Sequence, residues 1–206
     1  MEAHDNCWHC GNPSAESLFC RFCNTLQRPK PDYFRFMGLE PRLSIDAADL
    51  QKRFYSLSRL LHPDHYNRAS PTEKQYSLEA TAILNDAYRV LRDPVSRAEY
   101  ILKEEGFEIG EQKSKDVAPE LLEEVFDLNM AVEELRGGDA SVAPQLEAAR
   151  SRFLALRREV DDSLAQLYAA YDAGRERQRL SEIRGLLNRR CYIQNLVNEV
   201  ERELAP

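Results

Sequence analysis

Four of the five cysteines form two Cys-x-x-Cys pairs near the N-terminus: Cys7 with Cys10, and Cys20 with Cys23. Thiolates at this spacing can surround one tetrahedral ion. A segment of about 30 residues buries too little apolar surface to fold alone, and a structural zinc ion supplies on the order of 10–16 kcal/mol. The pattern therefore predicts a structural zinc site. We expect a minimal core of three nearby apolar side chains: Trp8, Leu18 and Phe19.

The same cysteines allow a redox interpretation, as two disulfides or as a thioredoxin-like pair. A redox Cys-x-x-Cys normally opens a helix within a βαβ unit, and the surrounding residues do not have that pattern. Persistent disulfides are also rare in a reducing cytoplasm. Structural metal is favoured, and a thiol oxidoreductase remains the alternative. Cys191 has no cysteine or histidine partner nearby in sequence, so we expect a half-buried structural thiol there.

The second group of residues that could do chemistry is His62-Pro63-Asp64. A histidine and a carboxylate could serve acid–base catalysis, but no nucleophile or third orienting group accompanies them, so we predict no catalytic residues and no enzyme. Asp64 can instead pair with an arginine of a partner protein. Pro63 stiffens the loop and lowers the cost of ordering it on docking.

Two helices must position this tripeptide. Asp46 is a plausible N-cap for a helix over residues 47–61, which ends at His62 because a residue before proline disfavours helix. Lys52 and Arg59 lie on the face of this helix opposite its apolar side. A polar loop leads to a second helix over residues 72–92. Two such helices joined by a loop predict an antiparallel hairpin. Residues 27–31, with two prolines, predict a stiff linker before it.

After Gly106 the chain is rich in acidic residues and is predicted to be helical. Pro119 begins a helix that Gly137 ends, Pro144 begins a second that Gly174 stops, and a third follows over residues 175–204. Short connections between long helices predict an antiparallel three-helix bundle.

The first helix of this bundle carries two apolar rows. One row has bundle-core spacing: Leu121, Val125, Leu128, Val132 and Leu135. The other lies about 100° away on the helix: Leu122, Phe126 and Met130. Acidic residues flank the second row, which suggests a partner surface. Packing of this row against another helix is the alternative.

Composition limits the function classes. The net charge of −7 argues against a nucleic-acid partner, and no apolar run reaches the roughly 18 residues that a membrane helix needs. The first residues lack a signal core or an arginine-rich presequence, which predicts a cytoplasmic location. The mature form of a mitochondrial matrix protein is the alternative.

The residues from 32 to about 103 resemble a J domain in order and spacing. The matching motifs are Asp32-Tyr33-Phe34, Gly38-Leu39, His62-Pro63-Asp64, Asn85-Asp86-Ala87-Tyr88, Leu91, Asp93-Pro94, Arg97 and Tyr100. The resemblance implies that His62, Pro63 and Asp64 engage a DnaK- or HscA-type ATPase chaperone, with Lys52 and Arg59 as basic contacts. His65 stands where J domains often carry Lys or Arg, which favours a specialised chaperone.

From about Cys7 to the C-terminus the chain resembles the HscB family of iron–sulfur co-chaperones. Residues 122–129, Leu-Glu-Glu-Val-Phe-Asp-Leu-Asn, are similar to that family's client helix. The resemblance implies contacts to an IscU-like scaffold protein by five residues: Leu122, Phe126, Asp127, Glu134 and Tyr192.

The sequence therefore predicts an all-α protein of three parts: a zinc-stabilised unit with its linker (residues 1–31), a J domain (32–106) and a three-helix client-binding domain (107–206). Its expected function is to deliver the scaffold to the chaperone and stimulate the chaperone's ATPase, promoting cluster transfer. A J protein for an unrelated client is the alternative within the same class.

Overall fold

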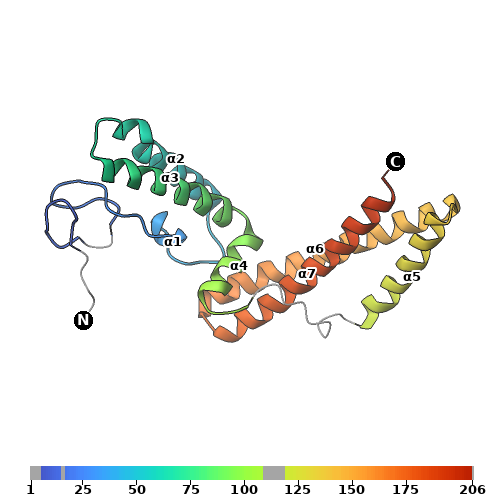
Figure 1. Ribbon diagram of the computed structural model, residues 1–206. Helices are drawn as coiled ribbons and strands as arrows, with labels where there is room; N and C mark the ends of the chain where they lie inside the picture. Colours follow the sequence, from blue (N-terminus) through green and yellow to red (C-terminus); the bar gives the residue numbers. More distant parts are fainter. Residues whose placement is uncertain (1–5, 15–16, 109–118, 206) are drawn as a thin grey trace. The chain divides into compact units, whose positions relative to one another are not determined.

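A computed structural model of the protein describes residues 6–14, 17–108 and 119–205, with the backbone alone between 119 and 123. The chain forms two compact units, Met1–Tyr100 and Ile101–Pro206. Helices dominate both units, and the described residues contain two isolated β-bridges but no strand (Figure 1). The all-α prediction is confirmed. The three-part division at residues 31 and 106 stays a prediction.

The first unit begins with the cysteine segment and continues into a helical hairpin. A short helix α1 (Tyr33–Phe36) precedes α2 (Ala47–Leu61) and α3 (Pro71–Arg92), which lie side by side (Figure 1). A 3₁₀ turn, η1 (Pro63–Tyr66), joins the two long helices. Helix α4 (Pro94–Glu104) follows α3 after a single residue. The predicted antiparallel hairpin is therefore present.

Local capping explains where the hairpin helices begin. The Asp46 carboxylate accepts a hydrogen bond from the backbone N–H of Ala48 at 2.8 Å. Ser70 and Glu73 form a capping box: the Ser70 hydroxyl accepts from the Glu73 N–H at 3.2 Å, and the Glu73 carboxylate accepts from the Ser70 N–H at 3.4 Å. Helix α3 thus starts at Pro71, one residue before its predicted start, because proline suits the first helical position.

The hairpin core combines aliphatic and aromatic side chains. Leu50, Leu61 and Leu84 are almost fully buried, and the rings of Phe54 and Tyr88 stack at 4.3 Å between centroids. Arg97 is also buried, and it donates through Nε to the carbonyl oxygen of Leu43 at 2.8 Å and through Nη1 to that of Leu91. A buried guanidinium that satisfies two carbonyl groups fixes the end of α3 against the loop that follows α1.

The second unit contains three long helices, α5 (Pro119–Arg136), α6 (Ala143–Gly174) and α7 (Arg177–Glu203). A short 3₁₀ turn, η3 (Ala140–Val142), links α5 to α6. Helices α6 and α7 pair along their length, and α5 packs against the pair (Figure 1). The core between them includes Leu146, Phe153, Ile183 and Val200, each at most 1% exposed.

Ion pairs link these helices across the bundle. Arg150 pairs with Glu201 at 2.7 Å and Arg190 with Asp161 at 2.5 Å, so α6 and α7 run in opposite directions. Arg136, the last residue of α5, contacts Glu203 near the end of α7 at 2.5 Å.

The turn between α6 and α7 differs from the prediction that Gly174 ends the helix. Gly174 is still helical, and Arg175 adopts the left-handed conformation, with φ of 55°. The Arg175 guanidinium lies over the Tyr171 ring at 5.4 Å, a cation–π contact that offsets part of the strain at a non-glycine residue.

None of the described helices has both the length and the apolar character needed to cross a bilayer.

Candidate functional site

The two cysteine pairs are built on the same turn, repeated thirteen positions later in the chain. The N–H groups of Gly11 and Asn24 donate to the carbonyl oxygens of Cys7 and Cys20 at 2.9 and 2.8 Å. Gly11 and Asn24 both have positive φ, of 71° and 55°. Glycine and asparagine are the residues that tolerate this conformation best. Each turn therefore presents its two sulfur atoms in the same way, and the two turns face each other.

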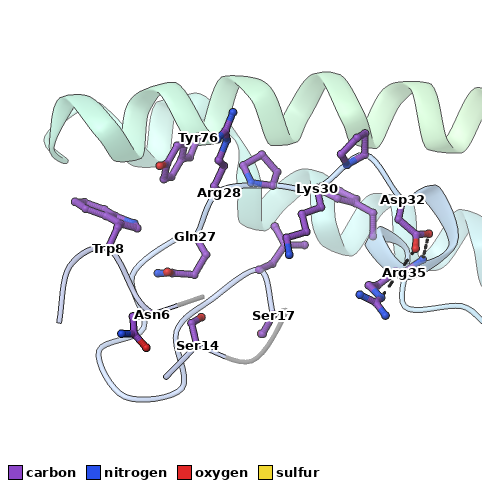
Figure 2. Close-up of a pocket in the computed structure, with 14 residues that line it drawn as sticks. Asn6, Trp8, Ser14, Ser17, Gln27, Arg28, Lys30, Asp32, Arg35 and Tyr76 are labelled. Atoms are coloured by element: carbon purple, nitrogen blue, oxygen red, sulfur yellow. Dashed lines mark hydrogen bonds and ion pairs between the residues drawn. The ribbon is translucent and has the colours of Figure 1, made fainter. Parts of the chain in front are cut away.

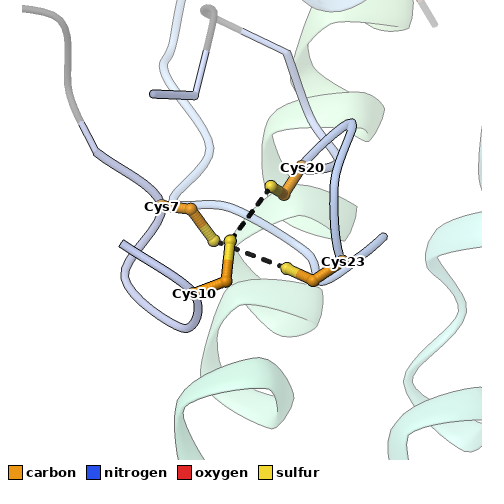
Figure 3. Close-up of side chains that lie close together, drawn as sticks. All are labelled: Cys7, Cys10, Cys20 and Cys23. Atoms are coloured by element: carbon orange, nitrogen blue, oxygen red, sulfur yellow. Dashed lines mark hydrogen bonds between the residues drawn. The ribbon is translucent and has the colours of Figure 1, made fainter. Parts of the chain in front are cut away.

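The four sulfur atoms converge on one point (Figure 3). Cys7 Sγ lies 3.6 Å from Cys23 Sγ, and Cys10 Sγ lies 3.7 Å from Cys20 Sγ. All four lie within 4.8 Å of one another. Tetrahedral zinc–thiolate bonds of about 2.3 Å would place the sulfur atoms about 3.8 Å apart. The donor set therefore fits a single tetrahedral ion, and the four predicted ligands are brought together.

Hydrogen bonds favour the thiolate at Cys23 and Cys7. At Cys10 the hydrogen bonds from Asn12 lower the pKa, but burial and the Cys23 and Cys7 side chains raise it overall. The hydrogen bond between Cys23 Sγ and the Thr25 hydroxyl, 3.3 Å long, is the main cause that lowers the pKa of Cys23 to about 5. Burial opposes ionisation of Cys7, but backbone hydrogen bonds from Cys10 and His9 help to lower its pKa overall. Metal ligands must be deprotonated, so these contacts prepare the site for a cation.

The small core of this unit differs from the prediction. Trp8 is 38% exposed, and Leu18 and Phe19 are half-buried, whereas Leu26 is 1% exposed. Trp8 Nε1 donates to the Leu26 carbonyl oxygen at 2.8 Å. Leu26 was missed because it lies beyond the last cysteine, where spacing alone gives no signal.

Gln27 also belongs to the cysteine unit and not to the predicted linker. It is 8% exposed, and its Nε2 lies 3.3 Å from Cys7 Sγ and donates to the Thr25 carbonyl oxygen at 2.8 Å. A side-chain amide that donates to a ligand sulfur is a recurring support for metal sites.

The tripeptide His62-Pro63-Asp64 lies exposed where α2 ends and η1 begins. The Asp64 side chain is 77% exposed and that of His62 53% exposed. His62 Nδ1 accepts from the Asp64 N–H at 3.3 Å and lies 3.5 Å from the Asp64 carboxylate. The imidazole thus caps the turn, while the Asp64 carboxylate faces solvent.

Two hydroxyl groups of α3 donate hydrogen bonds to the end of α2. Ser77, fully buried, donates to the Leu61 carbonyl oxygen at 2.7 Å, and Thr81 donates to the same oxygen at 3.3 Å. A helix leaves its last carbonyl groups without partners, so these bonds fix the point from which the tripeptide departs. No pattern in the sequence indicates this role of Ser77 and Thr81.

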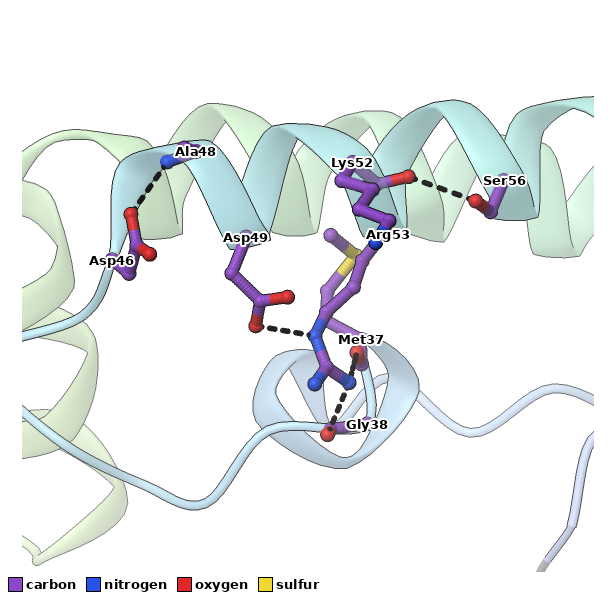
Figure 4. A network of polar contacts seen from close by, with 8 residues as sticks. All are labelled: Met37, Gly38, Asp46, Ala48, Asp49, Lys52, Arg53 and Ser56. Atoms are coloured by element: carbon purple, nitrogen blue, oxygen red, sulfur yellow. Dashed lines mark hydrogen bonds and ion pairs between the residues drawn. The ribbon is translucent and has the colours of Figure 1, made fainter.

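The basic face of α2 is exposed at both predicted positions, Lys52 and Arg59. Arg53 beside it has a structural role (Figure 4). Its Nε donates to Asp49 at 2.7 Å and its Nη1 to the Gly38 carbonyl oxygen at 2.7 Å. A Cβ atom at Gly38 would lie 3.1 Å from this Nη1, and Gly38 has a φ of 65°, so both space and conformation favour glycine. Arg53 thereby joins α2 to the turn that follows α1.

The predicted second row of α5 lies off the bundle core in the part that is described. Phe126 and Met130 are 66% and 50% exposed, whereas Leu128 and Val132 are 2% and 3% exposed. Asp127 and Glu134 are exposed on the same helix. The side chain of Leu122 lies outside the described residues.

Tyr192 lies half-buried on α7, between two residues that contact α6. These are Arg190, which pairs with Asp161, and Gln194, which accepts from Arg157. Arg152, further towards the start of α6, pairs with Glu124 of α5. Tyr192 is therefore placed towards the N-terminal end of α5.

Cys191, next to Tyr192 in the sequence, is exposed, so the prediction of a half-buried thiol was wrong.

Comparison with known proteins agrees with this geometry. Residues 32–100 match the DnaJ domain family. The human iron-sulfur cluster co-chaperone protein HscB is 30% identical over 209 residues, which cover 98% of this chain and 84% of that protein. The Arabidopsis thaliana homologue of that co-chaperone is 29% identical and covers 98% of this chain and 76% of its own length.

Solved structures show the same likeness. The crystal structure of human HscB superposes with a TM-score of 0.74 at 29% identity and covers 97% of this chain and 98% of that one. The chaperone HscB from Vibrio cholerae gives a TM-score of 0.58 at 29% identity, over 82% of this chain and 95% of its own. Residues 32–100 match the J-domain family model, and human HscB matches nearly the whole chain in sequence and in structure, so the chain belongs to the HscB family of J-domain co-chaperones.

Proposed function

We propose that this co-chaperone delivers an IscU-like iron–sulfur scaffold protein to an HscA- or DnaK-type chaperone and stimulates the chaperone's ATPase, which promotes cluster transfer. One observation carries the proposal: the chain exposes two separate candidate partner surfaces, one in each unit. The Asp64 side chain is 77% exposed in the first unit, and Phe126 is 66% exposed in the second. Relatives named iron-sulfur cluster co-chaperones support the choice of client.

The chaperone surface would be formed by His62, Pro63 and Asp64, with Lys52 and Arg59 on the adjoining face of α2. Asp64 would accept a bidentate contact from an arginine of the chaperone, because its carboxylate faces solvent and its backbone N–H is already used by His62. Lys52 and Arg59 would steer the encounter with an acidic partner.

The client surface would centre on Phe126, with Leu122 one turn before it and Tyr192 on the neighbouring helix. Asp127 and Glu134 would supply negative charge. An exposed phenylalanine within an acidic helix fits a partner that offers an apolar pocket with basic residues around it. The 66% exposure of Phe126 supports this role over internal packing.

The metal in the cysteine unit is proposed to be zinc in a structural role, bound by Cys7, Cys10, Cys20 and Cys23. The convergence of all four sulfur atoms on one point supports a metal site over two independent redox pairs. Zinc has no redox chemistry of its own, so the ion would hold the two turns together.

A steady-state ATPase assay tests the proposed delivery. The chaperone is measured alone, with this protein, with an IscU-like scaffold, and with both. The expected result is stimulation by this protein that rises further when the scaffold is added. A J protein for an unrelated client would stimulate to the same extent with and without the scaffold, and a thiol oxidoreductase would not stimulate at all.

A further inference from the structure

Trp8 of the cysteine unit and Tyr76 of α3 meet edge-on, with 6.1 Å between their ring centroids (Figure 2). Aromatic pairs in this arrangement add stability beyond the area that they bury. A cavity of about 730 Å³ lies beside the pair, between the cysteine unit and α1. The aromatic pair is thus a direct contact between the cysteine unit and the hairpin, in addition to the chain that connects them.

The orientation of Trp8 depends on both cysteine turns. Trp8 follows Cys7 in the first turn. Its Nε1 donates a 2.8 Å hydrogen bond to the carbonyl oxygen of Leu26, which comes after the second turn and is 1% exposed. The indole therefore spans the two turns and keeps its position only while they face each other. An ion bound by the four sulfur atoms would hold the turns in that arrangement.

Tyr76 lies on the turn of α3 that holds the base of the proposed chaperone loop. The next residue, Ser77, is fully buried and donates to the Leu61 carbonyl oxygen at 2.7 Å. Thr81, one turn later, donates to the same oxygen at 3.3 Å. Leu61 directly precedes His62. A contact that restrains the backbone at Tyr76 therefore acts on the two donors that fix the start of the loop.

We propose that Tyr76 is a positioning residue, through which the metal-bound cysteine unit restrains the loop His62-Pro63-Asp64. A loop that is already held in one arrangement loses less conformational freedom on docking, so the chaperone binds it more tightly. Loss of the metal would release Trp8 and leave Tyr76 without its partner ring. The effect on chaperone binding rests on the proposed function, whereas the restraint on the loop is a property of this protein alone.

Amide hydrogen exchange of the full chain measures the restraint directly, because it reports local opening. Two sets of N–H groups are followed: those of residues 77–81, and that of His65, which donates to the His62 carbonyl oxygen at 3.0 Å. Removing the metal with a chelator should speed their exchange by about two- to tenfold, the factor that corresponds to the loss of one aromatic pair. Exchange in α6 and α7 should not change, because these helices belong to the second unit.

Variants of Tyr76 show whether the aromatic pair transmits this effect. In metal-loaded Tyr76→Leu, exchange should be as fast as in the unmodified protein without metal, and metal removal should speed it no further. Tyr76→Phe keeps the ring and should behave like the unmodified protein. Leu78→Ala is the matched control, because Leu78 is 59% exposed on the same turn of α3, and it should leave exchange unchanged. Both Tyr76 variants should keep their metal, since no ligand is altered.

A steady-state ATPase assay with an HscA-type chaperone measures the consequence for binding. Metal-loaded Tyr76→Leu should need about two- to tenfold more protein for half-maximal stimulation than the unmodified protein. The maximal rate should stay the same, because the tripeptide itself is intact. If the unmodified protein does not stimulate at all, the proposed function is wrong, and the exchange experiment still decides whether Tyr76 restrains the loop.

The proposal is overturned if metal removal leaves exchange at residues 77–81 unchanged, or speeds it equally in Tyr76→Leu and in the unmodified protein. The second result would mean that the metal acts on the hairpin through residues 28–31 and not through the aromatic pair. Equal effects of Leu78→Ala and Tyr76→Leu would also overturn it. So would unchanged half-maximal stimulation by Tyr76→Leu, where the unmodified protein stimulates the chaperone.

Discussion

The buried hydroxyl of Ser77 in α3 donates a 2.7 Å hydrogen bond to the carbonyl oxygen of Leu61, the last residue of α2. Leu61 directly precedes His62, so this bond joins the second helix of the hairpin to the base of the proposed chaperone loop. Neither residue faces a partner, yet together they determine where the loop starts.

Ser77→Ala should lower the free energy of unfolding by about 1 kcal/mol, because the Leu61 carbonyl oxygen keeps only the longer bond from Thr81. Urea unfolding at an unchanged m-value measures the loss. More of the variant should also be needed for half-maximal stimulation of the chaperone's ATPase. The control is Ser163→Ala, whose exposed hydroxyl bonds only within its own helix. An equal loss of unfolding free energy in Ser163→Ala would show that the hydrogen bond from Ser77 to Leu61 has no particular importance for stability.

Asp64→Asn should abolish ATPase stimulation and leave unfolding unchanged, because the exposed carboxylate is the charged half of the proposed contact. A charged hydrogen bond contributes about 1.5–3 kcal/mol to binding, so its loss should dissociate most of the complex with the chaperone. Asp86→Asn provides a matched control on α3, since Asp86 makes only an exposed ion pair with Arg89. Normal stimulation by the Asp64 variant would show that this loop does not contact the chaperone.

Phe126→Ala should weaken binding of an IscU-like scaffold by around 1–2 kcal/mol or more, as truncation of an aromatic anchor does. The melting temperature should hardly change, because the side chain is 66% exposed. Leu128→Ala is the contrasting variant: Leu128 is 2% exposed, and its truncation should cost about 2–5 kcal/mol of stability. Calorimetry and thermal melting measure the two effects. Unchanged scaffold affinity in the Phe126 variant would place the client site elsewhere.

Purified protein should carry about one zinc ion per chain, and Cys10→Ser should lose it. Without the ion the two cysteine turns separate, so Trp8 should leave Leu26 and Tyr76 and its emission should shift to longer wavelength. Helical circular dichroism should persist, because the described helices all begin after the cysteine segment, at Tyr33 or later. Cys191→Ser should change neither metal content nor emission, since Cys191 is outside the cluster. Bound iron with visible absorbance would contradict the structural zinc site.

The ends of the helices could be predicted from the sequence because they depend on neighbouring residues. Asp46 and Pro63 bound α2 as predicted, from Ala47 to Leu61. Gly137 likewise follows the end of α5 at Arg136. A cap or a proline acts within one turn, so its effect is visible in a short stretch of sequence. At the end of α6 the same reasoning missed by one residue: Arg175, and not Gly174, adopts positive φ, with its guanidinium over the Tyr171 ring.

For the cysteine cluster, too, the sequence predicts one part and the tertiary structure decides the other. The spacing by itself identified Cys7, Cys10, Cys20 and Cys23, since two equal turns can bring four sulfur atoms to one point. The tertiary structure decided what surrounds them: Leu26 in place of the expected core, and Gln27 beside Cys7. It also decided the contact of Trp8 with Tyr76, the bond from Ser77 to Leu61 and the exposure of Cys191. Such contacts join residues far apart in the chain, and their partners are chosen by packing, which leaves no periodic signal in a single sequence.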